Sequence, residues 1–250
     1  MTSDNMTAGT GIETKMAQLE ELDFPEEYFC GKGADGRINA SADAEEEPYE
    51  PDIKFDIEDR RLGKLKKAAI WLEVELPELL LGAYFFLLRE ISEQPFIVVQ
   101  TMLTDCGQVF PLRANLNQYP DLSELFRAVK RQCAQSFKPG LYPLALLKDI
   151  TPRKVHHHRI VPFFCWDFHP EKAALEKAAF ERLISSYYDL RFCFHRLPEA
   201  RTPAGRVGCS CGFNRQRLRQ DMVEKVIHAY LHVLDMVIEK MDSGGLLRQV

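Results

Sequence analysis

The chain has 250 residues, of which 46% are hydrophobic, and a net charge of −5. This length suffices for one large domain or two small ones, and no apolar run approaches the roughly 20 residues of a membrane-spanning helix. The N-terminus, MTSDNMTAGTGIETK, lacks the basic start and apolar core of a secretion signal. The seven cysteines are an odd number and several lie in apolar, strand-like runs, which favours a reducing cytoplasm over a disulfide framework.

The first 50 residues differ in charge from the rest of the chain. They carry thirteen acidic and three basic side chains, a net charge of −10, so the remaining residues carry +5. Such a segment buries too little apolar surface to offset its ordering entropy, and we predict a largely flexible acidic arm over residues 1–50. One stretch within it, LEELDFPEEYF (residues 19–29), has enough Leu and Phe to dock on another surface. The basic residues elsewhere form no stripe interleaved with stacking aromatics, so nucleic acid is not an expected partner.

Strands and helices alternate in the first half of the remaining sequence. DIKFDI (52–57) alternates apolar and polar residues as a half-buried strand does, and EDRRLGKLKKAA after it is typical of a short basic helix. Residues 76–92 are apolar nearly all round, which predicts a buried helix. A β-branched run at 95–103 predicts a central strand, and 108–116 a second strand in which Pro111 marks an edge or a bulge.

The second half continues the alternation. Apolar residues at helical spacing predict an amphipathic helix over 120–137, which leads to the strand-like run RIVPFFCWDF and a helix over 170–186. Two further strands are predicted at 188–195 and 206–213, and a long helix closes the chain over 214–240. This order, without internal repeats, predicts an α/β fold.

Four stretches, in this order, resemble the C-terminal lobe of nonribosomal peptide synthetase condensation domains, members of the chloramphenicol-acetyltransferase-like superfamily. They are LPELLLGAYFFLLREISEQPFIVVQTML, FPLRANLNQYPDLSELFRAVKRQ, SYYDLRFCF and CGFNRQRLRQDMVEKVIHAYLHVLDMV. The resemblance covers about residues 52–241. It implies one acetyltransferase-like lobe over 51–242, a mixed sheet covered by helices, followed by a flexible tail at 243–250.

Two departures from the family pattern bear on catalysis. The family's catalytic motif, His-His-three residues-Asp-Gly, stands in the N-terminal lobe, and only the acidic arm precedes residue 52. The connection between VQTML and FPLR, which helps to close one lobe of the family over the other, is reduced here to TDCGQV. The resemblance therefore implies a half-domain without catalysis of its own.

A histidine triplet, His156, His157 and His158, is the most conspicuous candidate for chemistry. Neither His pair is followed by Asp and Gly at the family's positions, and no neighbouring acid would orient an imidazole as a general base requires. Adjacent residues of an extended strand point to opposite faces, so only His156 and His158 could share a metal ion. We interpret the triplet as a solvated lead-in to a strand; a partner contact, a metal site and catalysis remain alternatives.

Two cysteines, an arginine and an aspartate are further candidates. Cys209 and Cys211 alternate with Ser210 on one strand, and we expect them to be small core residues rather than a metal pair or nucleophiles. Arg113 and Asp189 match positions of the family pattern, and we expect a structural hydrogen-bonded pair or network, with a binding role as the alternative.

These observations predict a stand-alone half-condensation-domain protein of nonribosomal peptide biosynthesis, located in the cytoplasm and non-catalytic alone. It would act by docking to a complementary lobe, a carrier protein or a second copy of itself, through surfaces such as the basic RRLGKLKK and NRQRLRQ. No metal, membrane or cofactor is expected beyond contact with a carrier protein's phosphopantetheine arm. One alternative is an oligomeric acyltransferase with its active site between subunits, where His156, His157 or His158 would act; another is a zinc protein that uses histidines and the Cys-x-Cys pair.

Overall fold

The structure is a computed structural model that describes residues 52–92, 95–103, 109–119, 121–136, 160–167, 188–197, 206–215 and 217–243. The predicted acidic arm, the histidine triplet and the predicted helix at 170–186 lie outside the described residues, as do residues 244–250 of the predicted tail.

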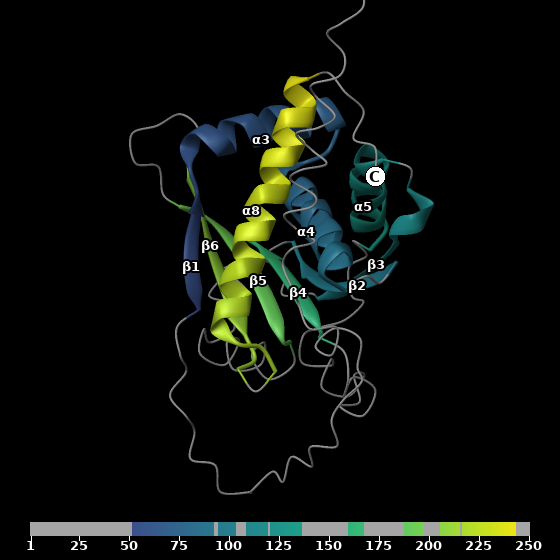
Figure 1. Cartoon of the computed structure of the whole chain (residues 1–250). Helices are drawn as coiled ribbons and strands as arrows, with labels where there is room; N and C mark the ends of the chain where they lie inside the picture. Colours follow the sequence, from purple (N-terminus) through teal and green to yellow (C-terminus); the bar gives the residue numbers. More distant parts are fainter. Residues whose placement is uncertain are drawn as a thin grey trace, which may run out of the picture.

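The described residues form six strands and four α-helices, which confirms the predicted α/β class (Figure 1). The strands are β1 (Ile53–Ile57), β2 (Phe96–Met102), β3 (Phe110–Asn115), β4 (Pro162–Trp166), β5 (Leu190–Leu197) and β6 (Arg206–Phe213). The helices are α3 (Asp59–Leu72), α4 (Leu76–Ser92), α5 (Leu122–Ser136) and α8 (Gln220–Asp242), and a 3-10 turn, η1 (Leu116–Gln118), follows β3.

The strands form one mixed sheet in the order β1-β6-β5-β4-β2-β3, as the mixed-sheet prediction requires. Strand β4 pairs in parallel with both β2 and β5, and the other three pairings are antiparallel. Pro111 lies in β3 at the edge of the sheet, where its missing N–H costs no ladder hydrogen bond.

Single residues set the start of α5 and the distance between α4 and α5. Asp121 caps α5, because its Oδ1 accepts a hydrogen bond from the Glu124 amide at 2.9 Å. Gly82 lets α4 approach α5 closely, since a Cβ at that position would lie 2.2 Å from the Phe126 ring. None of the described helices is long and apolar enough to cross a membrane.

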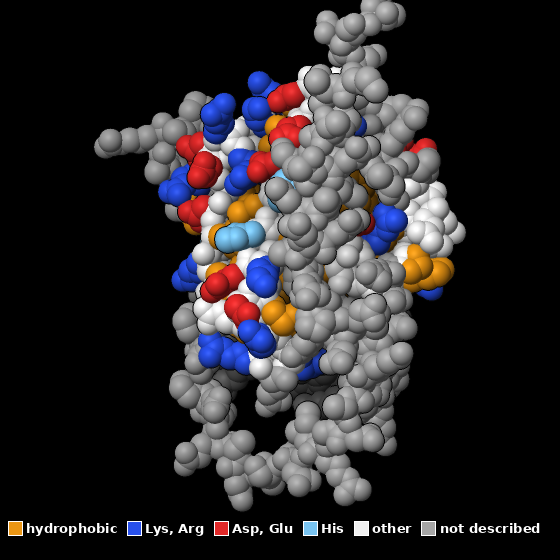
Figure 2. All heavy atoms as spheres, in the orientation of Figure 1, with side chains coloured by type: hydrophobic (Ala, Val, Ile, Leu, Met, Phe, Trp, Pro, Cys, Tyr) orange, Lys and Arg blue, Asp and Glu red, His pale blue; other side chains and the backbone are white. Residues whose placement is uncertain are grey.

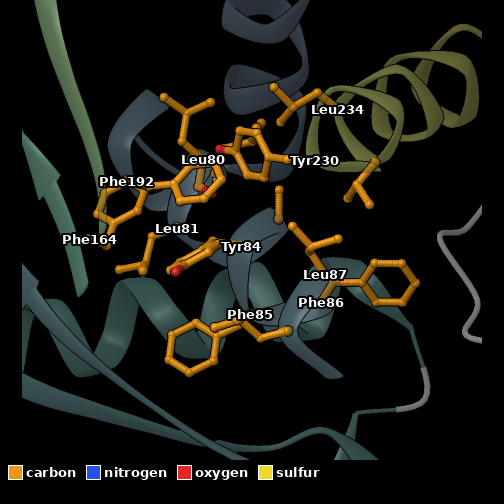
Figure 3. Packing of buried hydrophobic residues seen from close by; sticks show 14 of the residues in the cluster. Leu80, Leu81, Tyr84, Phe85, Phe86, Leu87, Phe164, Phe192, Tyr230 and Leu234 are labelled. Atoms are coloured by element: carbon orange, nitrogen blue, oxygen red, sulfur yellow. Dashed lines mark hydrogen bonds between the residues drawn. The ribbon is translucent and has the colours of Figure 1, made fainter. Parts of the chain in front are cut away.

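One hydrophobic cluster joins all four helices to one face of the sheet. In Figure 1, α8 passes over β4 to β6, and α4 and α5 lie toward β2 and β3. At the centre, Tyr84 of α4 and Tyr230 of α8 meet Phe192 of β5, with ring centroids 4.8 and 5.2 Å from that of Phe192 (Figure 3). The Tyr230 hydroxyl donates to the Leu80 carbonyl at 2.9 Å, so this buried polar group is satisfied.

Candidate functional site

The described strands carry a second face, away from the helix-covered core. Side chains alternate along a strand, so the residues between the core positions point to this side. We call it the second face. It includes, outside the core cluster, Phe96, Val98, Gln100 and Met102 of β2, Arg113 of β3, Phe163 and Cys165 of β4, Arg191, Cys193 and His195 of β5, and Gly208, Ser210 and Gly212 of β6. Its middle, at Met102, Phe163 and Cys165, is buried.

The β2 end of the second face is apolar and exposed. Phe96 is 62% exposed and Val98 44% exposed, although both lie in a regular strand of the sheet. Gln100, two residues further on the same face, has a buried Oε1 without a hydrogen-bond partner within the described residues. Exposed aromatic and branched side chains on a regular strand are typical of a surface that another molecule covers.

The β5–β6 end of the second face is polar and already filled. The Arg191 side chain is only 7% exposed; it lies on Gly212, where a Cβ would be 2.2 Å from Nη2, and pairs with Asp52 at 3.3 Å. His195 lies in the same way on Gly208, whose Cβ would be 2.6 Å from Nε2. Because β6 offers only small residues here, long side chains of β5 lie across it, and this end of the face leaves little room for a ligand.

Asp189 is the centre of a buried hydrogen-bonded network. Its Oδ2 accepts from the Val161 amide at 2.9 Å and from Arg217 at 2.5 Å, and its Oδ1 accepts from Asn214 Nδ2 at 3.1 Å. The Asn214 amide also donates to the Asp189 carbonyl at 2.8 Å. The residue therefore ties the start of β4 and the start of β5 to the turn between β6 and α8.

Arg113 lies elsewhere, on the edge strand β3, with β2 and β4 between it and Asp189. Its side chain is exposed, and its main chain is clamped by Gln132 of α5, whose Nε2 donates to the Arg113 carbonyl at 2.9 Å and whose Oε1 accepts from the Arg113 amide at 3.1 Å. This amide takes the place of a neighbouring strand and blocks the open edge of the sheet. The sequence prediction missed Gln132, because only the fold brings it to β3.

Cys209 and Cys211 are buried core residues of β6, as predicted. Burial raises the pKa of both thiols, and nearby carboxylates, Asp56 for Cys209 and Asp52 for Cys211, raise it further. A thiol held protonated in this way is a poor nucleophile. Throughout the described ranges, no three His, Cys, Asp or Glu side chains gather as a metal ion would require.

Solved structures with the same fold match this chain, whereas the sequence comparisons found no match. No protein-family model matches the sequence, and no curated protein matches it either. Among solved structures, the condensation domain of the monacolin K polyketide synthase MokA is similar, with a TM-score of 0.58 and 12% identity over 96% of this chain and 60% of that one. The SgcC5 protein from Streptomyces globisporus has a TM-score of 0.59 and 12% identity over 92% of this chain and 56% of that one.

A third similar structure is the complex of the X-domain with OxyB from teicoplanin biosynthesis. Its TM-score is 0.58, with 16% identity over 78% of this chain and 46% of that one. The chain therefore has the α/β fold of condensation domains, and it spans between 46% and 60% of the length of these three structures.

Proposed function

We propose that the chain corresponds to the C-terminal lobe of a condensation domain and acts in nonribosomal peptide biosynthesis by docking to a complementary lobe. Three observations support the lobe assignment: the fold, the length matched to only part of each similar structure, and the order of the four resembling stretches. The X-domain structure, in which a condensation-type fold is bound to OxyB, is a precedent for a protein partner.

The observation that carries the proposal is the exposed apolar end of the second face. Covering Phe96 and Val98 would contribute about 2–4 kcal/mol at roughly 25 cal/mol per Å² of apolar surface. A stable protein interface buries about 1,200–2,000 Å² in total, so these two residues would be the centre of a larger contact.

The docked partner, rather than this chain, would supply the catalytic residues for acyl transfer. Both carboxylate oxygens of Asp189 already accept hydrogen bonds, and Arg113 is held through its main chain at a sheet edge. Neither residue is therefore placed to move a proton during acyl transfer. A carrier protein's phosphopantetheine arm would be shared with the docked lobe, and the chain itself would hold no cofactor.

The test combines docking with activity. The tagged full-length chain is co-expressed with the products of neighbouring genes, and the complex is measured by light scattering after size exclusion. Phe96→Asp should abolish the complex, whereas Ile70→Asp, a matched change on exposed α3, should leave it intact. Amide formation from an acyl thioester should need the complex. Turnover by the isolated chain that is lost in the His156, His157, His158→Ala variant would instead support an acyltransferase that works between its own subunits.

A further inference from the structure

A second exposed apolar surface lies on α3, on the helix side of the fold. Ile70 is 78% exposed and Trp71 is 42% exposed, at the C-terminal end of this helix. They line up with Arg60, Gly63 and Lys67 at spacings of three and four residues, so these five residues form one outward stripe. We call it the α3 stripe. The buried residues of α3 lie on the opposite side: Leu62, Leu65, Ala68, Ala69 and Leu72.

The α3 stripe is basic, and no carboxylate of the described elements neutralises its charges. Arg61 and Lys64, on the side toward α8, pair with Asp235 and Asp242 at 2.8 Å each. Figure 2 shows such positive and negative side chains intermingled where α3 meets the end of α8. Arg60 and Lys67, in contrast, are exposed and pair with no carboxylate of the described residues. Open space lies above Gly63, between them, since nothing lies within 4 Å of a Cβ there.

We propose that the acidic segment at residues 19–29 of the same chain binds the α3 stripe. The segment, LEELDFPEEYF, carries five carboxylates and no basic residue, together with Leu, Phe and Tyr side chains. Its carboxylates match Arg60 and Lys67, and its apolar side chains match Ile70 and Trp71.

The connection between the segment and the helix has a suitable length. Residue 29 is separated from β1 by about 23 residues, and a flexible chain of that length has a root-mean-square span of roughly 24–29 Å. Strand β1 covers about 17 Å, and the middle of α3 lies about 10 Å further along that helix. The linker between residue 29 and β1 is therefore about as long as the distance it has to span. A linker matched in this way gives the segment an effective concentration in the millimolar range at the α3 stripe.

Binding of this kind makes the segment an intramolecular competitor. An acidic partner that approached α3 would therefore compete with residues 19–29 for the same side chains. The inference does not depend on the proposed docking through the second face, because Phe96 and Val98 lie on the other side of the sheet.

Trp71 reports on the contact directly. The chain has two tryptophans, and the other, Trp166, is buried, so Trp166→Phe leaves Trp71 as the only emitter. In the full chain, replacing Glu20, Glu21 and Asp23 by Lys should raise acrylamide quenching of Trp71 roughly twofold or more, because a millimolar effective concentration keeps the unaltered segment bound most of the time. Arg60→Glu with Lys67→Glu should do the same, and combining both sets should restore protection by charge exchange. Arg127→Glu with Arg131→Glu, on exposed α5, is the matched control and should change nothing.

A second measurement remains informative if a variant fails to fold. Carbodiimide treatment of the unaltered chain should join Lys66 or Lys67 to a carboxylate of residues 19–29, as mass spectrometry would detect. In a mixture of isotope-labelled and unlabelled chains, these cross-links should stay within one chain. Cross-links between labelled and unlabelled chains would overturn the proposal in favour of a second copy. Equal quenching of Trp71 with the native and the Lys-substituted segment would overturn it altogether.

Discussion

Replacing Asp189 tests whether the buried network holds β4, β5 and the β6–α8 turn together. In Asp189→Ala the Val161 amide and Asn214 Nδ2 lose their acceptor, and Arg217 loses its counter-charge. In Asp189→Asn one amide oxygen remains. It can serve the Val161 amide and Arg217, but the new NH₂ group then faces the NH₂ group of Asn214, which must rotate to present its oxygen.

The structure sets the size of these two effects. The Asp189 side chain is 7% exposed and Arg217 is 28% exposed, so water can replace part of what the arginine loses. Breaking a buried ion pair costs about 3–5 kcal/mol, and a hydrogen bond to a charged group contributes about 1.5–3 kcal/mol. We expect Asp189→Ala to lower the free energy of unfolding by about 3–4 kcal/mol and Asp189→Asn by about 1.5–3 kcal/mol.

Equilibrium urea unfolding of the full chain, followed by circular dichroism, measures both values. Asp56→Asn is the control, since Asp56 pairs with Arg206 at the surface, and it should cost about 0–1 kcal/mol. A double-mutant cycle with Arg217→Met isolates the ion pair, for which we expect a coupling of about 1–3 kcal/mol. If Asp189→Ala were no more harmful than Asp56→Asn, the network would not be what positions these strands.

Three further predictions concern two helix glycines, two buried tyrosines and one buried cysteine. Gly82→Ala should destabilise the fold by about 1–3 kcal/mol, because the added methyl group overpacks against α5. Gly63→Ala, with open space around it, should instead stabilise α3 by up to about 1 kcal/mol. Thermal unfolding of the two variants measures both effects. Burial raises the pKa of Tyr84 and Tyr230 well above 10.0, so the stability that depends on their neutral hydroxyls is fully present below about pH 10. Above pH 10, the free energy of unfolding should fall by about 1.4 kcal/mol per pH unit for each tyrosine. The fall should be less steep in Tyr230→Phe. Burial also raises the pKa of Cys133 to about 12, so iodoacetamide should modify this thiol only when urea unfolds the chain; modification of the native protein at neutral pH would contradict its burial.

Much of the fold could be predicted because local signals and tertiary packing agree. The apolar run at 76–92 is α4 with the same bounds, since a segment that is apolar all round can only be buried as a helix of that length. The strand at 206–213 is β6, also with the same bounds, and its alternating cysteines face the core. Pro111 predicted an edge or a bulge, because proline cannot donate to neighbours on both sides of a central strand, and β3 lies at the edge.

The candidate site could be predicted only in part, because it depends on what lies over each face of the sheet. The run at 95–103 predicted a central strand, and β-branched residues look the same in sequence whether one face or both faces are covered. The exposure of Phe96 and Val98 is therefore a property of the arrangement of helices, not of the strand itself. Likewise Arg113 and Asp189 match family positions one by one, but their partners, Gln132 and Arg217, are set by tertiary contacts.

The two exposed apolar surfaces differ in charge, and this difference separates the two proposals in solution. On the second face, a basic residue, Arg113, lies opposite the exposed Val98 in the sheet, and the exposed Phe96 lies opposite the uncharged Asn115. Binding there is mainly hydrophobic and should survive an increase in ionic strength. On α3, Arg60 and Lys67 flank the apolar end of the stripe, and surface charges are screened beyond about 8 Å at physiological salt. A single salt titration should therefore expose Trp71 while leaving any complex through Phe96 intact, and loss of both together would mean that one surface serves both contacts.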